Sequence, residues 1–276
     1  MNTRDKGLEN AVATNPIDQA IPDVQSTIDT RHIAIQSVGI RSVKYPVLIE
    51  LQGQKPMPSV AEFEMTVFLP ADQKGTHMSR FIALLEEAQG NVLTVSGFRA
   101  MLVEMLQRLD APSGRIKMEL PYFLSKVAPI SGVSSLMDYQ LTLEGSATEA
   151  GQDIYLTVVV PVTSLCPCSK KISEYGAHNQ RSHVTARVQL KEDVDIAQFI
   201  SAIEQQASCE LYGLLKRPDE KYVTERAYDN PKFVEDLVRD VAIAMNKFKQ
   251  VGQYTVEAEN FESIHNHSAY ARIDRA

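Results

Sequence analysis

Alternation of apolar and polar residues marks several stretches of this sequence and predicts β-strands. Between Ala61 and Leu69 every odd-numbered residue is apolar, and Glu62, Glu64 and Thr66 lie between them. Further strands are expected over 31–51, which is mixed but β-branched, and over 116–122, 137–143, 154–160, 184–190 and from 254 past 264. Since successive side chains of a strand point to opposite faces, each strand should bury one face.

Apolar residues that recur three and four positions apart predict amphipathic helices between these strands. Met78, Phe81, Ile82 and Leu85 have this spacing. Three further stretches have it, at 98–109, 196–203 and 233–248. Two helices therefore follow each of two pairs of predicted strands.

The order strand, strand, helix, helix, strand, strand occurs twice, and the loose segment 145–151 separates the two occurrences. This pattern predicts an α+β protein of two tandem units, each with a helix pair on one face of a four-stranded antiparallel sheet. We place the first unit at 31–148 and the second at 149–276. Residues 1–30 are mostly polar and are expected to form a mobile arm.

Composition narrows the class of protein. The chain has 276 residues, is 44% hydrophobic, and carries 28 Lys and Arg against 35 Asp and Glu, a formal net charge of −7. Such a charge favours neither nucleic acid nor an anionic membrane as a partner. No apolar run is long enough for a spanning helix or a signal peptide, so a cytoplasmic location is expected. Three cysteines are too few for a disulfide framework.

One polar segment, 161–183, is too long for a hairpin turn and carries the candidate chemistry. It contains Cys166-Pro167-Cys168, with His178 twelve residues after the first cysteine. Sulfur and imidazole together suit zinc or a similar divalent ion. Cationic residues crowd the same region: Lys170, Lys171, Arg181 and Arg187.

The sequence offers no second matching pair of ligands, which favours an open, catalytic metal site completed by a carboxylate and water. Two other interpretations stay open at this point. In the first, the cysteines are ordinary buried thiols and His178 is a surface residue. In the second, a cysteine is a nucleophile and His178 is the base that activates it.

Two other clusters lie in the second unit. Asn230 and Pro231 resemble a helix start, which would place Glu235 in the first turn, as a dipole partner or as an acceptor for a guanine edge. His265 and His267 are two positions apart on a predicted strand and would share a face, which suits acid–base or ligand chemistry.

In the first unit, segment 73–80 joins a strand to a helix and carries Lys74 and Arg80. Such a junction binds phosphate in some proteins, although Thr76 or Ser79 capping the helix is the commoner role. No P-loop or dinucleotide fingerprint occurs.

Four of these runs together resemble the signature of type IB GTP cyclohydrolase I: Pro161 to His183, Lys74 to Phe81, Arg217 to Glu225 and Ile264 to His267. The resemblance covers essentially residues 31–276. It implies two tunnelling-fold (T-fold) units of ββααββ layout and a homotetramer with active sites between subunits. It also implies metal-dependent hydrolysis of GTP to 7,8-dihydroneopterin triphosphate and formate, the first step of tetrahydrofolate biosynthesis.

The resemblance also implies roles for individual residues. Cys166, His178 and Glu220 would bind the divalent metal, with Glu225 and His267 as alternatives to Glu220. Zinc, manganese and iron all suit these ligands. Glu235 would anchor the guanine edge, His265 would shuttle protons, and Cys168 would assist.

A triphosphate requires several cations brought together, and we expect four residues to supply them. These are Lys74, Arg80, Lys170 and Arg181. Two competing functions remain: the related T-fold nitrile reductase, with a nucleophilic cysteine, and a non-catalytic module that binds purine nucleotides.

Overall fold

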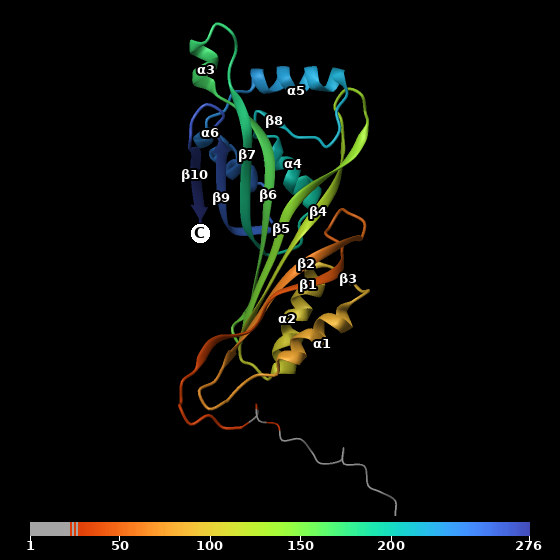
Figure 1. The fold of residues 1–276 in the computed structure, drawn as a ribbon, viewed down its shortest axis with the longest axis vertical. Coiled ribbons are helices and arrows are strands. Elements are labelled where there is room, and N and C mark those ends of the chain that lie inside the picture. The colour runs from red at the N-terminus through yellow and green to blue at the C-terminus, as the bar shows by residue number, and fades with distance from the viewer. Residues whose placement is uncertain (1–22, 24, 26) are drawn as a thin grey trace, which may run out of the picture.

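A single large sheet runs through the whole protein, and helices from both halves of the chain pack against one of its faces (Figure 1). The computed structural model describes residues 23, 25 and 27–276. The strands are β1 (Ile35–Ile49), β2 (Met57–Leu69), β3 (Val92–Leu93), β4 (Gly114–Val127), β5 (Ser134–Thr148), β6 (Gly151–Leu165), β7 (Asn179–Leu190), β8 (Cys209–Glu210), β9 (Val251–Phe261) and β10 (Ser268–Arg275). The helices are α1 (Met78–Ala88), α2 (Val95–Leu109), α3 (Pro167–Ile172), α4 (Ile196–Glu204), α5 (Arg217–Asp229) and α6 (Val234–Met245).

The strand order is β10-β9-β7-β6-β5-β4-β2-β1-β3, and β8 pairs with β6. Neighbours are antiparallel except β1 and β3, which are parallel. The α+β class is therefore confirmed, whereas the expectation of two separate sheets is wrong. The segment 145–151 is also not loose. Strands β5 and β6 are paired as far as Thr148 and Gly151, so only a tight turn separates the two halves.

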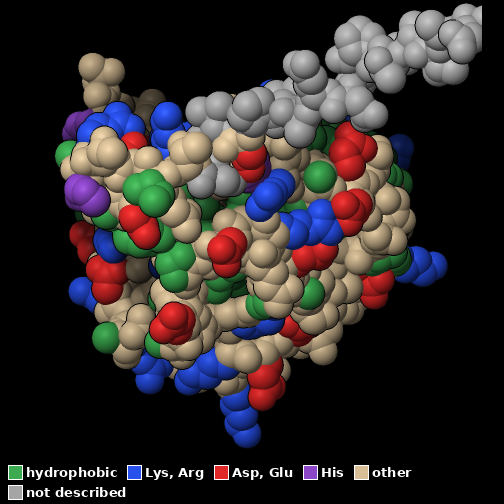
Figure 2. Space-filling view, turned by 90° about the horizontal axis from the view of Figure 1, so that it is seen from below, with side chains coloured by type: hydrophobic (Ala, Val, Ile, Leu, Met, Phe, Trp, Pro, Cys, Tyr) green, Lys and Arg blue, Asp and Glu red, His purple; other side chains and the backbone are tan. Residues whose placement is uncertain are grey.

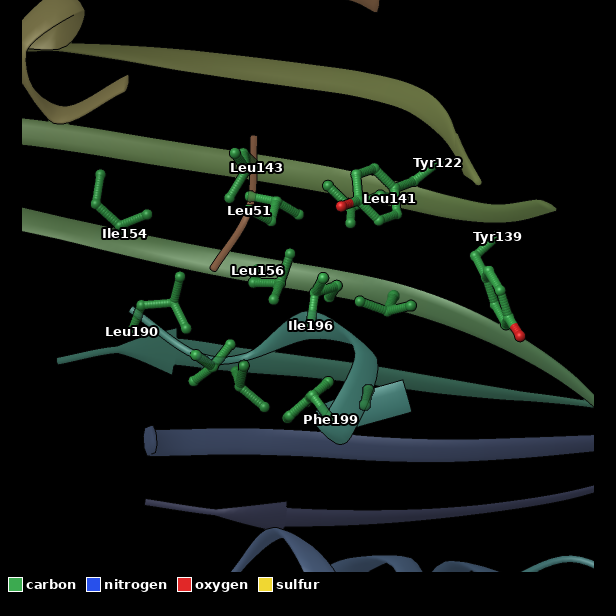
Figure 3. Packing of buried hydrophobic residues seen from close by; sticks show 14 of the residues in the cluster. Leu51, Tyr122, Tyr139, Leu141, Leu143, Ile154, Leu156, Leu190, Ile196 and Phe199 are labelled. Carbon is green, nitrogen blue, oxygen red and sulfur yellow. The ribbon is translucent and has the colours of Figure 1, made fainter. Parts of the chain in front are cut away.

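The strand, strand, helix, helix, strand, strand order recurs in both halves, with α1 and α2 in the first and α4 and α6 in the second, once the short strands β3 and β8 and the additional helices α3 and α5 are set aside. These helices bury the apolar face of the sheet in one continuous core. Figure 3 shows that core crossing the junction, with the strands of both halves contributing to it. Its labelled residues include Leu141, Leu143, Ile154, Leu156, Leu190, Ile196 and Phe199.

The hydrophobic pattern of the sequence did not predict α3 or α5, and it misplaced the start of α6 and the end of β9. Only Asp219 and Ala227 are buried in α5, so this helix has no apolar stripe for a pattern to detect. Asn230 follows the end of α5, and α6 begins at Val234, so the expected helix start at Asn230 is wrong. The final strand region is interrupted, because β9 ends at Phe261 and a turn precedes β10.

Segment 27–29 of the expected arm is ordered against the loop after β2. The backbone N–H of Asp29 donates to Asp72 at 2.9 Å, and that of Lys74 donates to Thr27 at 3.2 Å. Residues 1–22, 24 and 26 of the expected arm lie outside the described residues. Within the described part of the chain, no helix is both long and apolar enough to cross a membrane.

A buried ion pair ties the first half to the second. Lys126 of β4 places its Nζ 2.7 Å from Glu204 Oε1 at the end of α4, and the Tyr139 hydroxyl donates to the same oxygen at 2.8 Å. Burial raises the pKa of Glu204, and the Lys126 ammonium opposes that rise. The lysine therefore favours the charged form of this carboxylate, against the effect of burial.

Lys126→Met is expected to lower the free energy of unfolding at neutral pH by about 3 kcal/mol, because Glu204 is left buried without a counter-charge. Removing the ammonium raises the pKa of Glu204 further. The loss in free energy of unfolding therefore reaches its full size at pH values above that raised pKa. It disappears as the pH falls below the ordinary pKa of a glutamate, because the carboxyl is then protonated in both the folded and the unfolded chain. Urea unfolding at several pH values, at fixed protein concentration, measures this. Lys117→Met, which removes a more exposed pair with Glu119 on the same strand, is the control and should cost at most about 1 kcal/mol. A pH-independent loss for Lys126→Met would contradict the interpretation.

Candidate active site

The ends of several elements of the second half meet at one end of the sheet, the upper end in Figure 1. Leu165, the last residue of β6, pairs with Asn179, the first of β7, and the turn between β9 and β10 adjoins them. The backbone N–H of Lys232, just before α6, donates to the Leu165 carbonyl at 3.1 Å. The connection 166–178, the turn 262–267 and the start of α6 are therefore neighbours.

Cys166 and His178 lie side by side across the mouth of the β6–β7 hairpin. The Cys166 N–H donates to the His178 carbonyl at 3.1 Å. Cys166 is the N-cap of α3, and its Sγ accepts the N–H of Ser169 at 3.5 Å. The Ser169 hydroxyl accepts the N–H of His178 at 3.2 Å. The backbones of the two residues therefore meet, because α3 folds the connection back onto the hairpin.

The His178 ring is held at one nitrogen. Its Nδ1 lies 3.0 Å from Gln180 Oε1 and 3.3 Å from the Ser263 hydroxyl. With Nδ1 engaged, Nε2 is the atom that can bind a metal. Ser263 belongs to the turn 262–267, so this contact also brings His265 and His267 to the same end of the sheet.

His265 and His267 do not lie on a strand, so that part of the prediction is wrong. Both belong to the turn between β9 and β10, where their rings stack with centroids 5.2 Å apart. Both residues are exposed, as is Cys168. Glu235 is also exposed, in the first turn of α6, two residues after its N-cap Phe233.

A layer of buried polar side chains lies below this end, and the sequence analysis missed it. On β6, β7 and β9 the even-numbered residues face the helices and are apolar along most of each strand. Near the upper end they become polar yet stay buried: Ser164, Gln180, Ser182 and Asn260. The signal was available, because a break in alternation at the same end of three neighbouring strands marks a polar floor.

Two of the expected phosphate-binding cations lie near this end but in different surroundings. The Lys170 ammonium donates to the Tyr228 carbonyl and lies 4.2 Å from the centre of the Tyr228 ring, which joins α3 to the end of α5. Arg181 is exposed on the sheet face opposite His178. Burial lowers the pKa of His183, and Arg181 beside it lowers that pKa further.

Glu220 is not brought to Cys166 and His178 within one chain. It lies in the first turn of α5, whereas Tyr228, eight residues on, is the part of α5 that touches α3. Eight residues of helix span about 12 Å. The structure therefore places Glu220 at the far end of α5.

That far end of α5 is fixed to the first half by Asp219. This buried carboxylate accepts hydrogen bonds from the N–H groups of Ile130, Ser131 and Lys216, each at 2.8 Å, and from the Ser131 hydroxyl at 2.6 Å. Burial alone would raise the pKa of Asp219, yet these hydrogen bonds hold it well below its usual range.

Lys74 and Arg80 lie at the opposite end of the sheet. Val67, near the end of β2, aligns through β4 and β5 with Gln152 at the start of β6. The thirteen residues from there to Leu165 span about 40 Å of strand. Figure 2 views that lower end, where acidic and basic side chains are interspersed. One chain cannot bring these two cations to Cys166.

No group of three or more His, Cys, Asp or Glu side chains within the described residues is close enough together to hold a metal ion. The single chain supplies a cysteine and a histidine side by side, a polar floor beneath them, and Glu235 and two histidines on neighbouring segments. Of the residues expected at a metal and triphosphate site, this set lacks Glu220, Lys74 and Arg80.

Comparison with known proteins gives consistent results. Residues 21–271 match the family described as type I GTP cyclohydrolase folE2. The chain is 60% identical to GTP cyclohydrolase FolE2 of Burkholderia ambifaria over 92% of its length and 94% of that protein. It is 59% identical to the FolE2 proteins of Paraburkholderia xenovorans and Cupriavidus necator, over 92% of this chain and 95% of each relative.

Solved structures give a weaker likeness. Uricase from Arthrobacter globiformis has a TM-score of 0.46 and 9% identity, over 87% of this chain and 93% of that one. Urate oxidase from Bacillus subtilis has a TM-score of 0.46 and 10% identity, over 87% and 99%.

Proposed function

This chain belongs to the FolE2 family of type I GTP cyclohydrolases, and we propose that it opens the imidazole ring of GTP at C8 with a divalent cation held by Cys166 and His178. It is a GTP cyclohydrolase of folate biosynthesis, the activity that its relatives carry in their name. The proposed products are 7,8-dihydroneopterin triphosphate and formate. The observation that carries the proposed site is the direct backbone link between Cys166 and His178.

The donor set fits a divalent metal such as zinc, manganese or iron. A thiolate and an imidazole are ligands that these ions accept, and the held Nδ1 of His178 leaves Nε2 for coordination. We propose Glu220 as the carboxylate ligand. A bound cation of this kind would supply, from water, a nucleophile for C8 at neutral pH.

The neighbouring residues then have proposed roles in binding and proton transfer. Glu235 is exposed at the start of α6, where its carboxylate can accept two hydrogen bonds from a guanine edge. His265 lies in the turn that contacts His178 through Ser263, and we assign to it the proton transfers of ring opening. Cys168 is exposed two residues from Cys166 and would assist.

We propose that a second copy of the chain completes the site. Lys74 and Arg80 lie about 40 Å from Cys166 in the same chain, judged from strand length. Glu220 is at the far end of α5. A homotetramer with sites between subunits would bring these residues to Lys170, Arg181 and the cysteine–histidine pair of another copy. The repeated element order of the two halves supports the proposal that 31–148 and 149–276 are tandem T-fold units that share one sheet.

Removal of metal tests this proposal. Protein treated with a chelator and then freed of it should form no dihydroneopterin triphosphate from GTP, because the proposed mechanism relies on the cation to lower the pKa of the attacking water. Addition of Zn²⁺ or Mn²⁺ should restore the product, which is measured by neopterin fluorescence after oxidation. The control is the same protein carried through the procedure without chelator. Full activity without metal, abolished by alkylation of Cys166, would instead favour nucleophilic cysteine chemistry. GTP binding without turnover would favour the non-catalytic module.

A further inference from the structure

We infer that Gln180 is a positioning residue that fixes which nitrogen of His178 faces the metal. The inference rests on the proposed function, because it concerns how the chain prepares His178 for a metal ion. Gln180 is the second residue of β7 and is only 8% exposed, two positions after His178 on the same side of the strand. Its Oε1 lies 3.0 Å from His178 Nδ1.

A carbonyl oxygen can only accept a hydrogen bond, so this contact places the imidazole proton on Nδ1. The neutral ring then has its lone pair on Nε2. Without such a partner, the ring is free to carry its proton on either nitrogen. The Ser263 hydroxyl, 3.3 Å from the same Nδ1, can donate or accept and therefore does not choose between the two tautomers. Gln180 is the group that makes the choice.

The cost of keeping Gln180 buried argues for such a role. Farther along β7 the residues on the same face are Val184, Ala186 and Val188, all buried against the helices. Continuing this face with an apolar residue would avoid burying an amide, which is unfavourable unless the amide is hydrogen-bonded. The strand instead becomes polar at Ser182 and Gln180, the end of this face nearest the residue proposed to bind metal.

The backbone around the pair is held independently. The Cys166 N–H bonds to the His178 carbonyl, and the Ser169 hydroxyl accepts the His178 N–H. Changing the Gln180 side chain should therefore alter the orientation and tautomer of the ring rather than the course of the chain. This separation makes the role testable with side-chain variants.

The experiment compares Gln180→Met, which keeps the length but removes the acceptor, with Gln180→Glu, which keeps an acceptor. Zn²⁺ affinity is measured by competition with a chromogenic chelator. Gln180→Met should bind Zn²⁺ about 10- to 100-fold more weakly, the usual effect of losing a partner behind a metal-binding histidine. Gln180→Glu should bind at least as tightly as the unmodified protein. Gln189→Met, at the other end of the same strand, is the control and should leave the affinity unchanged.

A second measurement needs no metal. Nitrogen-15 NMR of the metal-free protein should show His178 protonated at Nδ1, and this preference should be lost in Gln180→Met and kept in Gln180→Glu. Circular dichroism verifies that each variant is folded. Unchanged Zn²⁺ affinity and an unchanged tautomer in Gln180→Met would overturn the inference while leaving the proposed function intact. A third outcome is also distinguishable: Gln180→Met loses the tautomer preference, but the unmodified protein binds no Zn²⁺. That outcome would contradict the metal role of His178 and leave the positioning role of Gln180 intact.

Discussion

Replacing Cys166 or His178 by alanine is expected to reduce the formation of dihydroneopterin triphosphate from GTP by about a thousandfold or more. Each variant removes one of the two proposed metal ligands, whose backbones are hydrogen-bonded to each other in a single chain. Without the cation, attack on C8 would depend on ordinary water, whose pKa is far above neutral. The loss should therefore appear in kcat, measured by neopterin fluorescence after oxidation.

Two matched controls separate this effect from damage to the fold. Cys209 is a buried thiol on β8, and His183 lies on the sheet face opposite His178. Cys209→Ser and His183→Ala should keep activity within a few-fold of the unmodified protein. Excess Zn²⁺ or Mn²⁺ should restore little activity to Cys166→Ala. Product formation near the normal rate in Cys166→Ala and His178→Ala would remove the metal role assigned to these residues.

Mixing two inactive variants is expected to restore activity, because the proposed site draws on two copies of the chain. Lys74→Ala should be nearly inactive through loss of triphosphate binding, and Cys166→Ala through loss of the metal. When the two are co-expressed in equal amounts, about a quarter of the sites should combine an intact Lys74 with an intact Cys166, if copies assemble at random. This expectation combines the proposed role of Lys74 with the distance along the sheet, since Lys74 cannot reach Cys166 in its own chain.

The mixed assemblies need one control and yield one further assignment. Co-expression of Cys166→Ala with His178→Ala should restore no activity, because both residues belong to the same chain's pair. Co-expression of Cys166→Ala with Glu220→Ala should restore activity if Glu220 acts from another copy. Failure of Lys74→Ala and Cys166→Ala to complement, in assemblies shown to contain both chains, would mean that the two residues do not meet in one site.

The sequence was a good guide to the elements with a clear hydrophobic period. The strand alternation around Phe63 and the helical stripe from Met78 both correspond to elements of the structure, β2 and α1. It was a poor guide to α5, because that helix buries little and is held by polar contacts such as those of Asp219. The single sheet could not be foreseen from periodicity, since pairing of β5 with β6 depends on a tight turn rather than on either strand's pattern.

For the site, residue type and spacing singled out Cys166 and His178, and the β6–β7 hairpin brings the backbones of these two residues together. The sequence alone could not predict the distances between segments that are far apart along the chain. Lys74 and Glu220 match a family pattern along the chain, but matching letters say nothing about which copy supplies them. Gln180 was overlooked because a single polar residue at the start of a strand looks like part of the preceding loop.

The bond between Cys166 and a metal is tested most directly by titrating metal-free protein with Co²⁺ and recording the absorption of the cobalt–thiolate bond in the near ultraviolet. The account predicts that this band appears with one Co²⁺ per chain, persists in Cys168→Ser and is absent in Cys166→Ser. A band that survives in Cys166→Ser, or that never forms in the unmodified protein, would contradict it.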